Sequence, residues 1–347
     1  MEKKDILSMP YNQLEEEIYL LGEPKFRTKQ IYTWLHQKQT TDFSKMSSLS
    51  LQLRERLDRI FCINRLKITR KLASSIDHTV KYLYELPDGN YVETVLMEYH
   101  YGKSLCISTQ VGCKMRCQFC ASTVAGFIRN LTPSEMLLQI YETQRDIGIR
   151  INHLVLMGIG EPLDNLENVL TFFQLLSDPK GFGMSLRHVT LSTCGLVPQI
   201  KQLADLHLGL ILSLSLHSPE NLRRSEIMPV NRRYPIEATM EACRYYFQVT
   251  GRRVTIEYAV IDHVNCSKLD AKKLAALLKD MYCHVNLIPV NPIAEKNFQT
   301  MRQNVELFQK ELETLGVNAT IRRTLGSDIQ AACGQLRRDA YQNIKET

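Results

Sequence analysis

The sequence predicts an α/β protein in which parallel strands alternate with helices, preceded by a helical N-terminal segment and a β-hairpin. Beyond Gly102, apolar strand candidates are separated by amphipathic helical stretches, and strands joined through whole helices must run parallel. Such an array is an open sheet or a full or partial barrel. In either case we expect the reactive side chains just beyond the C-terminal ends of the strands.

The composition is that of an ordinary globular protein. The chain has 347 residues, of which 44% are hydrophobic and 23% charged, which excludes a disordered, collagen-like or disulfide-scaffold protein. No apolar signal region follows Met1, and no uncharged apolar run is long enough to cross a bilayer. We therefore expect a cytoplasmic protein without membrane association, whose ten cysteines are metal ligands, catalytic groups or buried thiols.

The N-terminal segment is helical and basic. Residues 11–62 show helical apolar stripes and no convincing strand. Residues 23–71 hold 12 Lys and Arg against 4 Asp and Glu, whereas the remainder holds 31 against 33. This concentration of positive charge indicates a polyanionic partner, because Lys and Arg neutralise phosphates. A solvated helical face is the alternative interpretation.

The remaining elements follow from local patterns. Asp88-Gly89 lies between two alternating runs, at 79–86 and 91–97, and predicts a hairpin. The strands expected in the array are Leu105–Thr109, His153–Met157, His188–Leu191, Leu210–Leu216, Val254–Ile261, His284–Val290 and Val317–Arg322. The clearest helices are Pro133–Gly148, Pro235–Thr250, Ser267–Met281 and Met301–Leu315. The first of these helices begins with Thr132-Pro133-Ser134-Glu135, the pattern of a capping box.

Three cysteines carry the strongest chemical signal. Cys113, Cys117 and Cys120 form a Cys-x3-Cys-x2-Cys motif directly after the first strand of the array. Iron–sulfur clusters are normally held by such thiolates, and three ligands leave one iron open to a small molecule. A structural zinc site would require a fourth protein ligand, but no further Cys or His follows closely. Zinc binding and free thiols remain the alternatives from spacing alone.

The motif, with Phe119 before its last cysteine, resembles the signature of radical S-adenosylmethionine (SAM) enzymes. Other motifs narrow the resemblance to the RlmN-like RNA adenine methyltransferases of the RlmN/Cfr family. They are Glu93-Thr94-Val95, Cys106-x6-Cys113, Met157-Gly158-Ile159-Gly160-Glu161-Pro162, Ser192-Thr193, Ser215-Leu216-His217, Asn286-Leu287-Ile288-Pro289-Val290-Asn291 and Asp328-Ile329-Gln330-Ala331-Ala332-Cys333-Gly334-Gln335-Leu336. The match covers residues 10 to 340, and Cys194 departs from the serine usual in the family. It implies a partial six-stranded βα barrel.

The resemblance also implies the site residues. Cys113, Cys117 and Cys120 would hold a [4Fe-4S] cluster. The residues implied in SAM binding are Gly160, Glu161, Ser192, Ser215, Leu216, His217 and Asn291. From the residues alone, the glycine-rich turn is either a close approach to a ligand or a tight βα turn, and His217 is a core or neighbouring histidine.

Two further cysteines and one acid are implied as catalytic: Cys333, Cys106 and Glu93. Cys333 would receive a methyl group from one SAM, and a radical derived from a second SAM would activate that methyl for addition to adenine C2. Glu93 would take the C2 proton, and Cys106 would release the product by forming a disulfide with Cys333. Without the resemblance, both cysteines read as buried apolar residues and Glu93 as a charged residue on a solvated strand face.

The implied substrates are 23S rRNA and certain tRNAs, and the implied partner is a low-potential electron donor such as flavodoxin or ferredoxin. We expect a monomer divided into a basic helical RNA-binding domain (1–62), a hairpin linker carrying the base (63–98), the barrel with the methyl-carrier loop (99–333) and a tail (334–347). The alternatives are a C8 adenine methyltransferase of the antibiotic-resistance type and a non-catalytic metal-containing RNA-binding protein.

Overall fold

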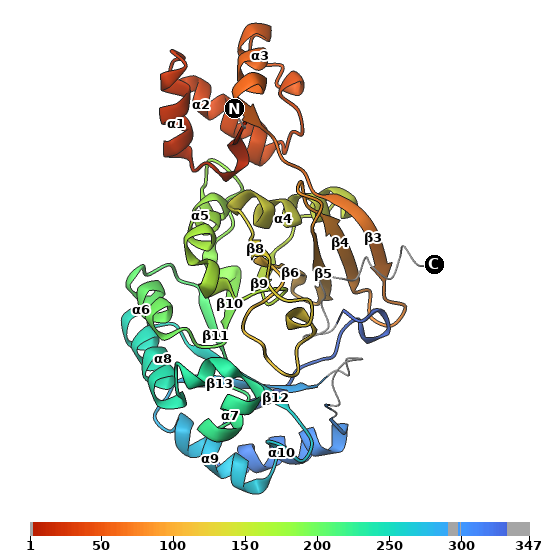
Figure 1. The fold of residues 1–347 in the computed structure, drawn as a ribbon, viewed down its shortest axis with the longest axis vertical. Coiled ribbons are helices and arrows are strands. Elements are labelled where there is room, and N and C mark those ends of the chain that lie inside the picture. Colours follow the sequence, from red (N-terminus) through yellow and green to blue (C-terminus); the bar gives the residue numbers. More distant parts are fainter. Residues whose placement is uncertain (1–2, 291–297, 299, 332–347) are drawn as a thin grey trace.

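The computed structural model describes residues 3–290, 298 and 300–331. Its centre is one mixed sheet of ten strands in the order β14-β13-β12-β11-β10-β9-β6-β5-β4-β3 (Figure 1). These strands are β3 (Lys67–Ala73), β4 (Val80–Glu85), β5 (Tyr91–Tyr99), β6 (Gly102–Cys106), β9 (His153–Leu156), β10 (Val189–Thr193), β11 (Ile211–Ser215), β12 (Val254–Val260), β13 (Cys283–Pro289) and β14 (Ala319–Ile321).

The parallel part of the sheet confirms the predicted partial barrel. Strands β6, β9, β10, β11, β12 and β13 are parallel neighbours, and the short β14 continues the array. Within the described residues the sheet ends at β14 and β3, so the barrel stays open. Each expected strand is present with slightly different ends. The pairing of β6 with β5 ends at Cys106, and beyond it the Ser108 N–H donates to the Gln139 side chain, 2.9 Å away.

The antiparallel part contains the predicted hairpin and one strand more. Strands β4 and β5 pair around a tight turn, in which the Leu86 N–H donates to the Asn90 carbonyl at 2.8 Å. Gly89 adopts a positive φ of 80° there, as the Asp-Gly signal requires. Strand β3 adds an outer edge to β4, and β5 pairs with β6. The hairpin is thus continuous with the barrel sheet.

The N-terminal module (residues 3–62) is helical, with one feature that its sequence did not indicate. Its helices are α1 (Tyr11–Leu20), α2 (Phe26–Tyr32), a π-helical turn (Thr33–Gln37) and α3 (Leu51–Ile60). Two short parallel strands, β1 (Lys4–Asp5) and β2 (Phe61–Cys62), join its two ends. The module packs on the barrel: His36 Nδ1 lies 3.0 Å from the Tyr141 hydroxyl, and Gln37 donates to the Lys180 carbonyl at 2.8 Å.

Helices cover the outer side of the sheet (Figure 1). They are α4 (Pro133–Ile147), α5 (Leu166–Ser177), α6 (Val197–Asp205), α7 (Asn221–Ile227), α8 (Ile236–Thr250), α9 (Lys268–Leu278) and α10 (Arg302–Thr314). The predicted capping box at Thr132 and Glu135 is present at α4. Helix α4 packs on the outer face of the antiparallel strands, where Thr94 donates to Gln139 at 2.7 Å. Among the described residues, no helix combines the length and apolar character needed to cross a membrane.

Candidate active site

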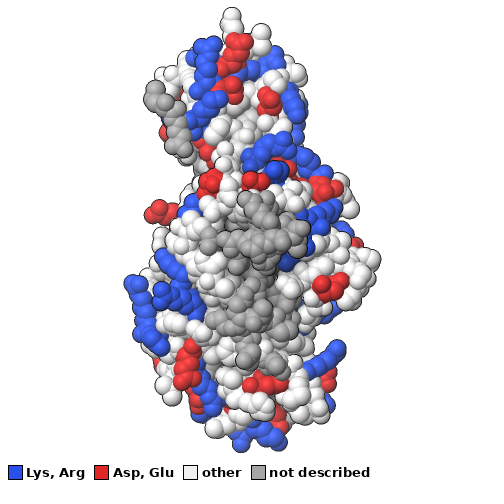
Figure 2. Space-filling model, turned by 45° about the vertical axis from the view of Figure 1, so that its right-hand side comes forward, with Lys and Arg blue, Asp and Glu red and all other residues white. Residues whose placement is uncertain are grey.

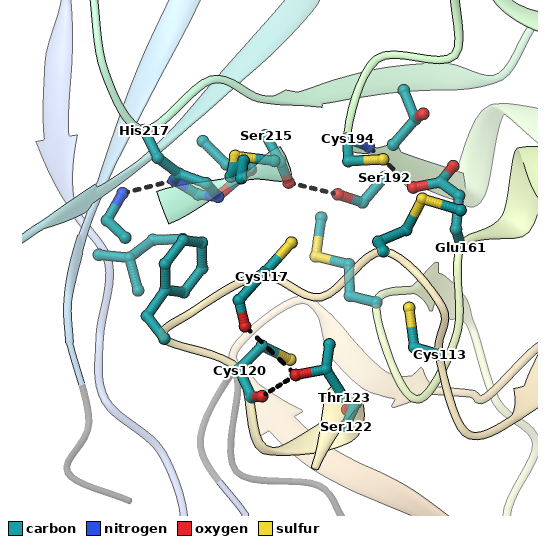
Figure 3. Close-up of a pocket in the computed structure, with 18 of the residues that line it drawn as sticks. Cys113, Cys117, Cys120, Ser122, Thr123, Glu161, Ser192, Cys194, Ser215 and His217 are labelled. Atoms are coloured by element: carbon teal, nitrogen blue, oxygen red, sulfur yellow. Dashed lines mark hydrogen bonds between the residues drawn. The ribbon is translucent and has the colours of Figure 1, made fainter. Parts of the chain in front are cut away.

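A cavity opens at the C-terminal ends of the parallel strands, as the fold class predicts (Figure 3). It encloses about 1030 Å³ of empty space, counted out to its open mouth. Its walls come from one loop after β6 and from the ends of β9 to β13. The predicted site residues that line it are Cys113, Cys117, Cys120, Gly160, Glu161, Ser192, Ser215 and His217. Leu216 lies directly behind this wall, and Asn291 lies outside the described residues.

The three cysteines lie on a loop whose ends are fixed. Strands β7 (Gln110–Val111) and β8 (Arg129–Asn130) pair antiparallel at its base. Gly112 has a φ of 77°, and a Cβ at this position would lie 1.7 Å from the Gly126 carbonyl oxygen, so only glycine allows the loop to close. At the far end the Gln118 N–H donates to the Ile227 carbonyl of α7 at 2.8 Å. The loop is therefore held at both ends over the cavity.

The thiols occupy one wall of the cavity, opposite Ser192, Ser215 and Glu161 (Figure 3). Burial raises the pKa of Cys113 to about 12 and that of Cys117 well above its ordinary value. To bind a metal as thiolates, these cysteines would have to lose their protons to the solvent. Across the part of the chain that the structure describes, no three Cys, His, Asp or Glu side chains are already gathered as a closed metal-ligand set. The donor chemistry nevertheless fits a cluster held by three thiolates of one loop.

The turn after β9 supplies the glycines and Glu161. A Cβ on Gly158 would lie 2.6 Å from the Ile107 carbonyl oxygen, and one on Gly160 would lie 2.6 Å from Gln110 Cβ. Close packing against residues 107–110 thus already requires glycine at both positions, whether or not a ligand binds here. The Glu161 carboxylate accepts the N–H groups of Leu163 at 3.1 Å and Cys194 at 2.8 Å. Burial raises the pKa of Glu161, and these two donors oppose that effect.

The ends of β10 and β11 place Ser192, Ser215 and His217. The two serine hydroxyls lie 3.4 Å apart. His217 has a φ of 58°, and its Nδ1 accepts the Ala259 N–H at 2.8 Å. Burial lowers the pKa of His217 to about 3, so the ring is neutral and its proton is on Nε2. The Leu216 carbonyl is held by Arg224 at 3.0 Å, behind the wall.

Two buried charged residues at this site were not among the residues predicted from the sequence. Arg224 is fully buried and donates to the carbonyls of Cys194 (2.7 Å), Ser215 (3.2 Å) and Leu216 (3.0 Å), which joins the ends of β10 and β11. Nothing in the sequence distinguishes it from any other helical arginine. The second residue is Glu257, an acid in the middle of an otherwise apolar strand, β12. That position was a usable signal.

Glu257 is 3% exposed and lines the cavity. Its Oε1 accepts hydrogen bonds from Ser213 Oγ at 2.7 Å and Asn286 Nδ2 at 3.0 Å. Its Oε2 is buried, has no hydrogen-bond donor among the described residues and lies 3.7 Å from the Arg322 guanidinium. This oxygen is therefore available to a polar group of a ligand in the cavity.

The candidate catalytic residues Glu93 and Cys106 lie on one face of the sheet, beside the cavity. Val95 pairs directly with Cys106, and Glu93, two residues earlier on β5, points to the same face. Glu93 is only 2% exposed, so the interpretation as a residue on a solvated face is wrong. The reason is long-range: a segment near the C-terminus covers the face. Ala331 and Leu325 pack with Val95 and Cys106 in one apolar cluster.

Met157 connects this cluster to the cavity, because it packs against the cluster and also lines the cavity wall. Cys333 lies outside the described residues, two positions beyond Ala331. The described chain thus brings Glu93, Cys106 and the approach to Cys333 to the same side of the cavity, although they are far apart in sequence.

Comparison with known proteins agrees with this architecture. The profile of the radical SAM superfamily matches residues 107–274, and that of the ribosomal RNA large subunit methyltransferase N-terminal domain matches residues 4–63. A crystal structure of a radical SAM methyltransferase from Sphaerobacter thermophilus superposes with a TM-score of 0.91 at 38% identity, covering 96% of this chain and 99% of that one. The barrel and its cysteine loop therefore define a radical SAM enzyme.

Relatives over the whole chain specify the family. The probable dual-specificity RNA methyltransferase RlmN of Lachnospira eligens is 48% identical over 99% of this chain and 98% of its own length. Its counterpart from Alkaliphilus oremlandii is 48% identical over 99% of this chain and 100% of its own length. The chain belongs to the RlmN family. Membership of the radical SAM superfamily implies a [4Fe-4S] cluster and SAM as its cofactors.

Proposed function

We propose that this chain methylates C2 of adenosine in 23S rRNA and in certain tRNAs, with Cys333 as the methyl carrier. The observation that supports this most strongly is the meeting of Glu93, Cys106 and the segment before Cys333 beside the cavity. A simple binding protein needs no buried acid and cysteine on one face next to a thiol-lined pocket. The names of the relatives, which are RNA methyltransferases, support an RNA substrate.

Cys333, Glu93 and Cys106 each carry out one step of the proposed reaction. Adenine C2 is electron-poor and bears only hydrogen, so it cannot attack a methyl sulfonium as a nucleophile. When bound, SAM and the cluster supply the methyl group and the radical chemistry, with two SAM molecules consumed per turnover. The Cys333 sulfur carries the methyl carbon to C2, and the Glu93 carboxylate accepts the C2 proton. The Cys106 thiolate then attacks the Cys333 sulfur and breaks its bond to the transferred carbon, which takes up a proton to become the methyl group of the released RNA; the disulfide that forms is reduced by an external reductant.

Most of the residues that we propose for cofactor binding line the cavity. Cys113, Cys117 and Cys120 would bind the cluster. We assign SAM to the polar strand ends opposite them, with Gly160, Glu161, Ser192, Ser215, Leu216, His217 and Asn291 as its binding residues. The neutral His217 donates from Nε2, which suits a ligand oxygen or nitrogen rather than a cation. We assign the low-potential electron donor to the flavodoxin or ferredoxin class.

The N-terminal module is the proposed RNA anchor of a monomeric, cytoplasmic enzyme. Exposed basic side chains lie on the module and continue along the edge strand β3 (Figure 2). They include Lys25, Lys29, Arg59, Lys67 and Arg70. Phosphate contacts at these positions would offset part of the few kcal/mol required to take the target adenine out of its stack.

Nucleoside analysis of the product tests the proposal. The anaerobically reconstituted enzyme is incubated with SAM, a reductant and 23S rRNA or tRNA made without modifications. Digestion and mass spectrometry should then show 2-methyladenosine in both RNAs. 8-Methyladenosine in its place would assign the enzyme to the C8 type. Absence of any methylated adenosine from a cluster-loaded enzyme that cleaves SAM would overturn the proposal.

A further inference from the structure

The segment that leads to Cys333 is held by the turn between β3 and β4. We call residues 325–331 the carrier loop. The Gly326 N–H donates to the Asp77 carboxylate at 2.9 Å, and the Ser75 N–H donates to the Asp328 carboxylate at 3.0 Å. Gly326 has a φ of 62°, and a Cβ there would lie 2.7 Å from Ala331 Cβ. Two hydrogen bonds, one donated in each direction, thus hold the carrier loop on the turn between β3 and β4, and Gly326 lets the loop fold tightly on itself.

A buried lysine connects the carrier loop to Glu93. Lys81 lies opposite Val95 in the β4–β5 ladder, so its side chain projects to the face that bears Glu93. Its side chain is 10% exposed, and its Nζ lies 3.0 Å from Glu93 Oε1. The same ammonium donates to the Gln330 carbonyl at 3.2 Å. Gln330, with a φ of 51°, ends the 3₁₀ turn Ser327–Ile329 of the carrier loop.

The environment makes this contact consequential. A carboxylate that is 2% exposed has lost nearly all its hydration, and a charge in that position is costly unless an opposite charge and hydrogen bonds replace the water. The ammonium has three donors on a flexible stem, so the Gln330 carbonyl restricts where the nitrogen can lie. The position of the Lys81 nitrogen in turn determines the orientation of the Glu93 carboxylate that it attracts.

We propose that Lys81 is a positioning residue for the proton transfer: it holds the Glu93 carboxylate in one orientation, and the carrier loop holds Lys81. The inference rests on the proposed role of Glu93 as the base that accepts the C2 proton. Lys81 acts through Glu93 and has no part in cluster binding or in methylation of Cys333. The orientation of the base therefore depends on the docked position of residues 325–331, the segment that precedes Cys333 in the sequence.

The test separates the two half-reactions. Lys81→Met, Lys81→Arg and Glu93→Gln are purified anaerobically, and iron content, methylation of Cys333 by labelled SAM and methylation of RNA are measured for each. Lys81→Met should keep wild-type iron content and Cys333 methylation but lose RNA methylation about 100-fold, within the range of a general base. Protein covalently attached to RNA should accumulate, because the C2 proton stays in place. Lys81→Arg should recover at least tenfold of the loss.

A matched control comes from the same sheet. Lys103 pairs with Glu98 across β5 and β6, away from the carrier loop, so Lys103→Met should behave like the wild type. RNA methylation at the wild-type rate by Lys81→Met, while Glu93→Gln is slowed, would overturn the inference about Lys81 and leave the proposed function standing. Normal RNA methylation by Glu93→Gln would instead overturn the assignment of the base. Loss of iron or Cys333 methylation in Lys81→Arg would show a general structural role and would also overturn the inference.

A double variant covers failure of Lys81→Met to fold. Lys81→Met combined with Glu93→Gln removes both members of the pair, so no charge is left buried alone. If Lys81 acts through Glu93, the double variant should methylate RNA within threefold of Glu93→Gln. A further 100-fold loss would contradict the inference.

Discussion

The cofactor cavity and the neighbouring face of β4, β5 and β6 are both buried, but different interactions hold them. In the cavity, Glu161, His217 and Arg224 are each fixed by hydrogen bonds to main-chain groups at the ends of strands. On the face, charged side chains contact one another, as Lys81 and Glu93 do. Substitutions in the cavity should therefore affect cofactor binding or the fold, whereas substitutions on the face should stop one step and leave the cofactors bound.

The largest effect expected in the cavity is loss of the cluster. Cys113→Ala, Cys117→Ala or Cys120→Ala should each lose nearly all bound iron and SAM cleavage, because three thiolates leave no ligand to spare. Iron analysis and absorption near 400 nm measure this. Cys62→Ser, in the N-terminal module, is the control and should keep its iron. Full iron content in Cys117→Ala would refute the assigned site.

Arg224 tests whether the cavity depends on main-chain contacts. Arg224→Met leaves the carbonyls of Cys194, Ser215 and Leu216 without this donor, which should cost about 3 kcal/mol of unfolding free energy. Urea unfolding of the apoprotein measures the change. A loss below 0.5 kcal/mol would mean that the strand ends hold their positions without the guanidinium.

The pH dependence of the unfolding free energy should report on His36, which is buried between the N-terminal module and the barrel. Burial lowers the pKa of His36 to about 3, whereas an unfolded histidine titrates near 6.5. Because the unfolded chain binds the proton first, stability is complete above pH 6.5 and falls by about 1.4 kcal/mol per pH unit as the pH decreases toward 3.

His36→Leu should reduce the slope of stability against pH by that amount between pH 6 and 5, measured by urea unfolding. The exposed His207, changed to Gln, is the control. An unchanged slope in His36→Leu would show that the His36 ring is hydrated or charged in the folded protein.

The smallest effect should come from the module surface. Lys25→Glu and Lys29→Glu remove exposed charges and should each reduce the slope of log K for RNA binding against log salt by about 1, without changing iron content. Lys310→Glu, on the exposed side of α10, should leave the slope unchanged. Wild-type salt slopes in Lys25→Glu and Lys29→Glu would exclude the module from the RNA interface.

Local features of the site could be predicted from the sequence because their causes are local. The three cysteines lie within eight residues, and the capping box at Thr132 needs only its own turn. Assignment of Ser192 and Ser215 to the same wall followed from parallel strand ends. These predictions required no knowledge of distant contacts.

The features that could not be predicted from the sequence depend on contacts between segments far apart in the chain. Glu93 looks solvated in an alternating strand, and it is buried because the carrier loop, more than 230 positions later, covers it. Lys81 gains its partner Gln330 through the same contact. The glycines at 158 and 160 suggested a ligand, but contact with residues 107–110 already requires them.

The most direct test of the account concerns Cys106, because only transfer through Cys333 makes two distant cysteines act in order. Cys106→Ala, loaded with its cluster and supplied with SAM, reductant and labelled RNA, is analysed on a denaturing gel before and after nuclease treatment. The account predicts a nuclease-sensitive covalent protein–RNA species, which Cys333→Ala does not form. Normal turnover by Cys106→Ala with no trapped species would contradict it.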